Sequence, residues 1–186
     1  MINKPTNRGF TLIETMVAVL ILATAIAGPL TIASKSLVAA TVAKDQITAF
    51  FLAQDAVEFI RFARDTNKLQ GGDWITGVGA ASGINLSNCR STNGCYFDSA
   101  LQNPTTISAC SASDCKPPLS GDQYLFESNG RYSYNSGGTK TIFVREVIIT
   151  DTVAGEEISV VVRVHWSDTG GTDRKVEVQE NLFNWQ

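Results

Sequence analysis

The chain is poor in the residues on which nucleic-acid-binding proteins and many enzymes depend. It has 15 Lys and Arg residues against 18 Asp and Glu, so its net charge of -3 excludes a broadly basic, phosphate-attracting surface. Its one histidine, His165, is accompanied by no second histidine, nucleophile motif or metal-ligand spacing. We therefore expect His165 to be a solvated or hydrogen-bonded surface residue. We expect no enzymatic activity, no nucleic-acid partner, no metal and no cofactor.

Charge is also scarce near the N-terminus, where Glu14 is the only charged residue between Arg8 and Lys35. A helix over residues 10–33 would be about 36 Å long, which exceeds a hydrocarbon core of roughly 30 Å. We therefore predict that residues 10–34 form a membrane-spanning helix. A carboxylate inside such a segment is costly and is usually retained for a function.

The flanking residues allow two ordinary explanations of this segment. Lys4 and Arg8, with no acid among residues 1–9, favour a cytoplasmic N-terminus with the remainder outside. The triplet AIA at residues 25–27 is typical of a signal-peptidase site, which would make Gly28 the first residue of an exported protein. An uncleaved membrane anchor is the other alternative, and neither accounts for the glutamate in the apolar run.

The sequence RGFTLIE, residues 8–14, supports a third explanation. It resembles the class III leader of type IV prepilins and type II secretion pseudopilins, in which glycine, an aromatic residue, Thr-Leu-Ile and glutamate occur at fixed spacing. The resemblance implies that a membrane prepilin peptidase cuts after Gly9, removes the leader 1–9 and methylates Phe10. It also implies other pilin or pseudopilin subunits and an inner-membrane assembly platform as partners, and a pilus or pseudopilus filament as the destination.

Two features of the apolar run gain a role from this resemblance. In a filament, the Glu14 carboxylate can pair with the α-amino group of a neighbour's Phe10, because an unpaired charge in low dielectric is heavily penalised. A simpler alternative is that Glu14 reaches the cytoplasmic interface of the membrane. Gly28 and Pro29 predict a kink or melted turn, since proline removes a backbone donor and the family often carries a proline at this depth.

The residues after the membrane segment predict a second, amphipathic half of the same helix. Apolar residues recur at helical spacings over residues 35–67, and no Gly or Pro occurs from residue 30 to residue 70. A near-continuous helix from Phe10 to Asn67 would be about 85 Å long. The stretch AFFLAQDAVEFIRFARDTN also resembles the corresponding helix of PilV-type minor pilins, although more loosely than the leader resembles prepilins.

Residues 68–122 are predicted to be a loop region, because they are rich in Gly, Ser, Asn and Pro and have little periodicity. All four cysteines lie in this region. Outside the membrane they favour two disulfides over a zinc site, whose paired cysteines usually stand closer together. Three pairings are open, and the local pairing is our choice because it needs the least rearrangement of the chain: Cys89 with Cys95, and Cys110 with Cys115.

Residues 123–186 predict an antiparallel sheet. Asn129-Gly130 between two strand-like runs is a strong hairpin signal. Alternating apolar residues from Ile158 to Trp166 predict a strand with one buried face, and Val176 and Val178 predict the same for the last strand. We expect a meander of consecutive strands covered by the second half of the long helix.

The predicted fold class is therefore α+β and pilin-like, with a long N-terminal helix packed against a C-terminal antiparallel sheet. The function that the resemblance implies is that of a structural subunit, a minor pilin or minor pseudopilin. The alternative is an exported or membrane-tethered binding or adhesion protein with an ordinary signal peptide.

Overall fold

The computed structural model describes residues 9–78, 83–99, 107–111, 115, 123–167 and 170–184. Most of the predicted leader, residues 1–8, lies outside this part of the chain. The chain divides into two compact units, Met1–Lys44 and Asp45–Gln186, and each is considered by itself below.

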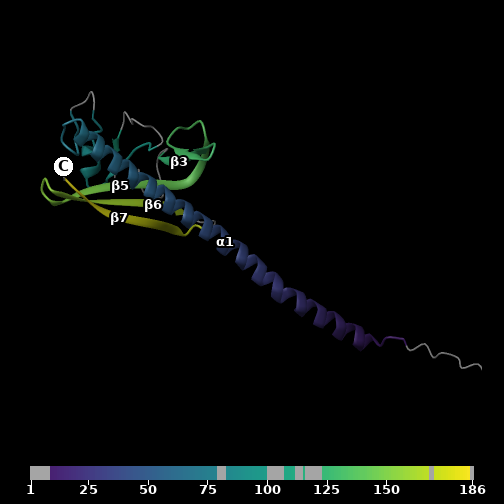
Figure 1. The fold of residues 1–186 in the computed structure, drawn as a ribbon. Helices are drawn as coiled ribbons and strands as arrows, with labels where there is room; N and C mark the ends of the chain where they lie inside the picture. Colours follow the sequence, from purple (N-terminus) through teal and green to yellow (C-terminus); the bar gives the residue numbers. More distant parts are fainter. Residues whose placement is uncertain are drawn as a thin grey trace, which may run out of the picture. The chain divides into compact units, whose positions relative to one another are not determined.

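Helix α1 runs from Leu12 to Leu69 and contributes to both units (Figure 1). Its 58 residues confirm the single long helix that the sequence predicts. The helix ends in a Schellman motif, in which Gly72 N–H donates to the Asn67 carbonyl and Gly71 N–H donates to the Lys68 carbonyl. Gly71 occupies the left-handed region at φ 75°, where glycine has no steric penalty, so the sequence Gly71-Gly72 fixes the end of the helix.

Among the residues that the structure describes, the remaining elements of the second unit form one seven-stranded antiparallel sheet and a short 3₁₀-helix, which confirms the predicted α+β class. Strand β5 is central: β6 pairs with one of its edges and β7 pairs with β6, and these three long strands lie side by side in Figure 1. The other edge of β5 is shared by β3 and β1. The elements are η1 (Ser87–Arg90), β1 (Cys95–Tyr96), β2 (Ser108–Ala109), β3 (Tyr124–Ser128), β4 (Arg131–Ser133), β5 (Thr139–Val153), β6 (Glu157–Ser167) and β7 (Asp173–Phe183).

The hairpin predicted at Asn129-Gly130 is confirmed. Both residues have positive φ, 53° and 76°, and they connect the paired residues Ser128 and Arg131. These angles suit a two-residue turn whose twist matches that of the flanking strands. The alternation predicted for the following region is confirmed in β6, where every second residue from Ile158 to Trp166 is buried.

The expected meander is wrong at one point, because β5 pairs with β3 and not with its predecessor β4. The chain after β4 turns back and enters β5 along the opposite edge of β3. Gly138 makes this return possible: a Cβ at this position would stand 2.6 Å from the carbonyl oxygen of Glu127 in β3. Only a residue without a side chain lets the two segments approach so closely.

The second half of α1 covers one face of this sheet, as the sequence predicts. Four alanines are among the helix residues that are buried on this side, at positions 49, 53, 56 and 63. Helix and sheet residues form one continuous core. From α1 this core contains Ala49, Leu52, Ala53, Ala56, Val57, Phe59, Ile60 and Ala63.

Candidate assembly site

The N-terminal end of α1 is a capped helix start. Thr11 immediately precedes the first helical residue, and its carbonyl and Oγ1 both accept from Glu14 N–H, at 3.1 and 3.3 Å. The spacing from Thr11 to Glu14 is that of a capping box, in which the glutamate can return a bond to the capping residue's N–H. Thr11 and Glu14 therefore stabilise the start of the helix, in addition to the assembly role that is predicted for Glu14.

The Glu14 side chain is exposed and forms no ion pair among the residues that the structure describes. Its carboxylate lies in the first turn of the helix, where the helix dipole favours negative charge. It is therefore available to a cation supplied by another molecule.

The first unit exposes nearly all of its large apolar side chains, from Leu12 through Val38. This helix is the one element of the described chain that is long and apolar enough to cross a membrane. Its hydroxyl groups are satisfied within the helix: Thr15 donates to the Leu12 carbonyl at 2.8 Å, and Thr31 donates to the Gly28 carbonyl at 2.7 Å. These groups therefore add little cost to placing the helix in lipid or against other helices.

Gly28 and Pro29 lie inside the helix, and the helical assignment continues through both. Proline cannot donate the bond that the carbonyl four residues earlier would accept. A Cβ at Gly28 would meet nothing within 4 Å, so glycine relieves no steric crowding here. The predicted bend of the helix axis at this position stays a prediction.

Residues 4–28 match the family model described as the prokaryotic N-terminal methylation motif. These residues carry the signature of type IV pilins and pseudopilins. No curated protein and no solved structure matches the chain. The pilin-type segment and the long apolar helix fit a membrane-anchored protein that assembles with other pilin subunits.

Gly9 and Phe10 precede the helix and are exposed. A Cβ at Gly9 would meet nothing within 4 Å, and its φ lies outside the left-handed region. Neither packing nor backbone conformation therefore requires glycine at this position of the pilin-type segment.

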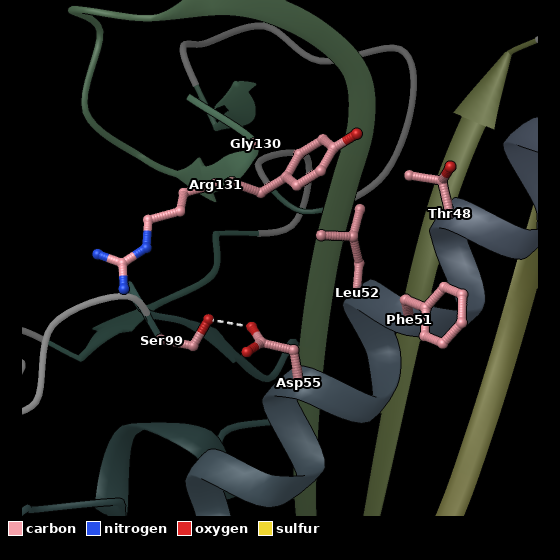
Figure 2. A pocket seen from close by; sticks show the side chains of 8 residues that line it. Thr48, Phe51, Leu52, Asp55, Ser99, Gly130 and Arg131 are labelled. Atoms are coloured by element: carbon pink, nitrogen blue, oxygen red, sulfur yellow. Dashed lines mark hydrogen bonds between the residues drawn. The ribbon is translucent and has the colours of Figure 1, made fainter. Parts of the chain in front are cut away.

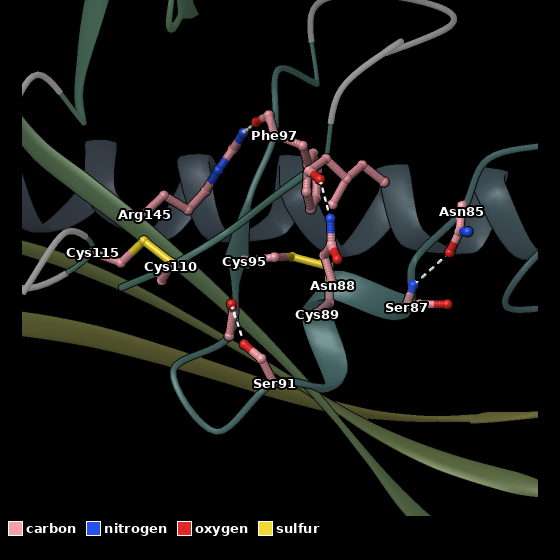
Figure 3. The surroundings of a disulfide bond; sticks show 12 residues. Asn85, Ser87, Asn88, Cys89, Ser91, Cys95, Phe97, Cys110, Cys115 and Arg145 are labelled. Atoms are coloured by element: carbon pink, nitrogen blue, oxygen red, sulfur yellow. Dashed lines mark hydrogen bonds between the residues drawn. A yellow bond between two sulfur atoms is a disulfide. The ribbon is translucent and has the colours of Figure 1, made fainter. Parts of the chain in front are cut away.

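The headpiece of this pilin-like chain contains two disulfides, Cys89–Cys95 and Cys110–Cys115 (Figure 3). These are the pairs that the sequence favoured. Cys89 and Cys95 are fully buried in the main core and connect η1 to β1. Both short strands that accompany them, β1 and β2, were missed by the sequence analysis, because two residues are too few to show a periodicity.

Arg145 joins three parts of the headpiece, although the sequence analysis did not single it out. Its side chain is 2% exposed, and its guanidinium donates to the carbonyls of Leu52 in α1 and Phe97 after β1, at 3.1 and 3.0 Å. It also donates to Asp55 at 3.0 Å and Ser99 at 3.1 Å, two side chains that face each other in Figure 2. The available signal was a charged residue inside the apolar run of β5. Such a residue indicates a buried charge with dedicated partners.

Asn67 and Asp73 fix the chain after α1. The buried Asn67 amide donates to the Trp74 and Ile84 carbonyls and accepts from Ile84 N–H, so it joins both ends of the following loop to the helix. Asp73 accepts from the backbone N–H groups of Ile75 and Thr76 at 3.0 and 2.8 Å. Partial burial opposes ionisation of Asp73, but these hydrogen bonds outweigh it and hold its pKa below the usual value.

His165 lies on the face of β6 opposite its buried residues, and it is half-buried there. Its side chain is only 15% exposed, and its Nε2 lies 3.8 Å from Oε2 of the fully buried Glu146. Arg163 extends across the neighbouring strands to Glu146 at 3.4 Å and Glu177 at 2.8 Å. The hydrogen bond to Glu177 raises the pKa of Arg163 and lowers that of Glu177, so both stay charged. Glu146 of β5 therefore lies close to both His165 and Arg163 of β6, a feature that the alternation of one strand does not reveal.

Proposed function

We propose that this chain is a structural subunit, a minor pilin or minor pseudopilin, of a type IV pilus or type II secretion-like filament. The observation that carries the proposal is the methylation motif at residues 4–28, which leads directly into an apolar helix that its own chain leaves uncovered. Apolar surface of this extent is unfavourable in water and needs lipid or other helices as neighbours. A subunit that first lies in a membrane and later packs into a filament has lipid, and then other helices, around this apolar surface.

Processing after Gly9 would create the partner that Glu14 lacks. The new α-amino group of Phe10 is a cation at the start of the same helix. In a filament the amino group of one subunit can lie beside the Glu14 carboxylate of the next, and a pair in low dielectric is strongly attractive. Because a shifted arrangement would leave a buried charge unpaired, the pair would also favour one axial stagger between subunits.

The proposed topology is a single span of the cell membrane, with a cytoplasmic N-terminus and an external headpiece. Lys4 and Arg8 support this orientation through the positive-inside rule. The two headpiece disulfides support it independently, because disulfides persist in oxidising compartments outside the cytosol. The partners would be other pilin subunits, a prepilin peptidase and the inner-membrane assembly platform.

One observation favours a second candidate, an exported or tethered binding protein with an ordinary signal peptide. The triplet AIA before Gly28 offers a cleavage site of small residues. Cleavage there would divide α1, which continues through Gly28, and would remove Glu14 from the mature protein.

Expression of the full chain with and without a prepilin peptidase tests the proposal. We expect a peptidase-dependent loss of mass that equals residues 1–9, and recovery of the processed chain in the sheared filament fraction of a cell that assembles pili. Gly9→Val should block both, and Gly28→Ala serves as the matched control that leaves both unchanged. Peptidase-independent cleavage that is lost in Ala27→Arg would support the signal-peptide alternative.

A further inference from the structure

The chain before η1 contains a sequon, the triplet Asn-x-Ser/Thr that marks acceptors of N-linked glycans. Asn85-Leu86-Ser87 has this pattern, whereas the other match in the chain, Asn103-Pro104-Thr105, is excluded by its central proline. Enzymes that recognise a sequon attach a bulky, hydrated glycan to the amide of its asparagine. Such triplets also arise by chance, so the argument depends on the surroundings of Asn85.

The two polar side chains of the sequon are exposed on a firmly held piece of backbone. Asn85 and Ser87 lie on the surface, while Leu86 between them is fully buried. The Leu86 N–H donates to the Ile75 carbonyl at 2.9 Å, which joins this segment to the preceding loop. A glycan on Asn85 would therefore extend into solvent without disturbing the core.

The atoms of the sequon that take part in glycosylation are not engaged elsewhere. The Asn85 side-chain oxygen accepts from Ser87 N–H at 2.9 Å, as Figure 3 shows. Within the described residues, the Asn85 amide nitrogen and the Ser87 hydroxyl form no hydrogen bond. In contrast, the amide nitrogens of several other asparagines donate to acceptors in the chain, namely those of Asn67, Asn88, Asn181 and Asn184. A glycan on Asn85 would thus replace no hydrogen bond of the headpiece.

The sequon also adjoins a feature of exported proteins. Ser87 is the first residue of η1, and Cys89 in the same short helix is bonded to Cys95. Because disulfides persist outside the cytosol, this disulfide supports a location of the sequon in an oxidising compartment. A sequon in a surface loop of an exported chain is the context in which the motif acts as an acceptor.

We propose that Asn85 is a site of N-linked glycosylation, and that the donor is an oligosaccharide joined through a diphosphate to a membrane lipid. In the transfer, the Asn85 amide nitrogen forms a bond to the anomeric carbon of the first sugar. The bond from that carbon to the phosphate oxygen breaks, and the lipid diphosphate leaves. A base of the transferase takes one proton from the amide nitrogen, and the Ser87 hydroxyl supplies the recognition group of the sequon.

Glycopeptide mass spectrometry of the mature protein, isolated from the cells that naturally produce it, tests the proposal. We expect the peptide that contains Asn85 to carry at least one sugar, and fragmentation to place that sugar on Asn85. An unmodified Asn85, or sugar only on serine or threonine residues, would overturn the inference.

Variants of the full chain, produced in the same cells, test whether the sequon directs the modification. Asn85→Gln and Ser87→Ala should each remove the added mass completely, whereas Ser87→Thr should retain it. Asn135→Gln changes an exposed asparagine outside any sequon and is the matched control, which should leave the added mass unchanged. Persistence of the added mass in Ser87→Ala would contradict the inference.

The inference goes beyond the proposed filament function, because it needs only an exported headpiece. The two can therefore fail separately. A mature chain that begins at Gly28 and carries a glycan on Asn85 would contradict the filament proposal alone. A mature chain that begins at Phe10 with an unmodified Asn85 would contradict the glycosylation site alone.

Discussion

The two halves of helix α1 differ in what covers their apolar side chains. From residue 45 to residue 69 the chain covers its own apolar face, because the sheet lies against Ala53, Ala56 and Ile60. From residue 12 to residue 38 the large apolar residues remain exposed. One continuous helix therefore contains a half whose partner is in the same chain and a half whose partner must come from elsewhere.

The charges follow the same division. The second half has charged residues on the side away from the sheet, such as Glu58 and Asp65, which is typical of a helix on the surface of a globular domain. The first half, before Lys35, has only Glu14 and is apolar on all sides. A helix that is apolar all round is buried on all sides in its working state, and this points to lipid or a bundle of helices.

Removal of the Glu14 carboxylate should have the largest effect on the first half. We expect Glu14→Ala to be processed normally but to fall more than a hundredfold in sheared filaments, since an uncompensated charge in a buried pair costs about 3–5 kcal/mol. Immunoblots of the sheared and membrane fractions measure this. Thr15→Ala, one residue away, is the control. Normal incorporation of Glu14→Ala would show that the residue acts only as a helix cap.

Loss of Arg145 should have the largest effect on the second half. Arg145→Ala removes the side-chain donor from the Phe97 carbonyl and the second donor from the Leu52 carbonyl, and we expect a loss of about 3 kcal/mol in the free energy of unfolding. Urea unfolding of the full chain in detergent, followed by tryptophan fluorescence, measures it. Arg131→Ala should change the stability by less than about 0.5 kcal/mol. Equal effects of the two variants would contradict the role of Arg145.

Removal of either disulfide should lower the free energy of unfolding less than removal of Arg145 does. The two losses should differ in size. Each closes a short loop, and the chain-entropy model assigns each about 2 kcal/mol. Replacing Cys89 and Cys95 by alanine also leaves a gap in the main core, so we expect this pair to cost more than Cys110 and Cys115. Unfolding of the two double variants under the same conditions decides the order. A larger loss for the Cys110–Cys115 variant would show that the core tolerates the gap.

Replacement of Asp73 should change the free energy of unfolding least, and the change should depend on pH. Its pKa is lowered in the folded state, so its contribution is present above the ordinary value near 3.8 and is lost as the pH falls through the lower folded value. We expect Asp73→Ala to cost about 1 kcal/mol at neutral pH, and the difference from wild type to narrow on acidification below pH 4. A difference that stays constant down to pH 2.5 would contradict the assignment.

Long-range patterns in the sequence predict the long helix, the sheet and the residues of the N-terminal segment. The long helix follows from an apolar run that begins at Phe10 and from a stretch without Gly or Pro that continues to residue 70. The hairpin follows from the dipeptide Asn129-Gly130. Each of these signals lies in residues that are close together in the sequence. The alternation in β6 depends on one strand and its buried face, so it too is local.

The features that the sequence did not predict depend on contacts between distant residues. The pairing of β5 with β3 depends on a close approach at Gly138, and the contact of His165 with Glu146 joins two neighbouring strands. The partners of Arg145 come from positions more than 40 residues away in the chain. The periodicity of apolar residues describes one helix or strand at a time, and it does not show which distant residues come into contact.

The identity of the first residue in the mature protein tests most directly the claim that the first half of α1 is built for other subunits. N-terminal sequencing and mass spectrometry of the chain isolated from membranes with an active prepilin peptidase measure it. We predict Phe10, methylated on its α-amino group, with Glu14 as the fifth residue. A mature chain that begins at Gly28 would lack Glu14 and most of the exposed apolar helix, and would contradict the account.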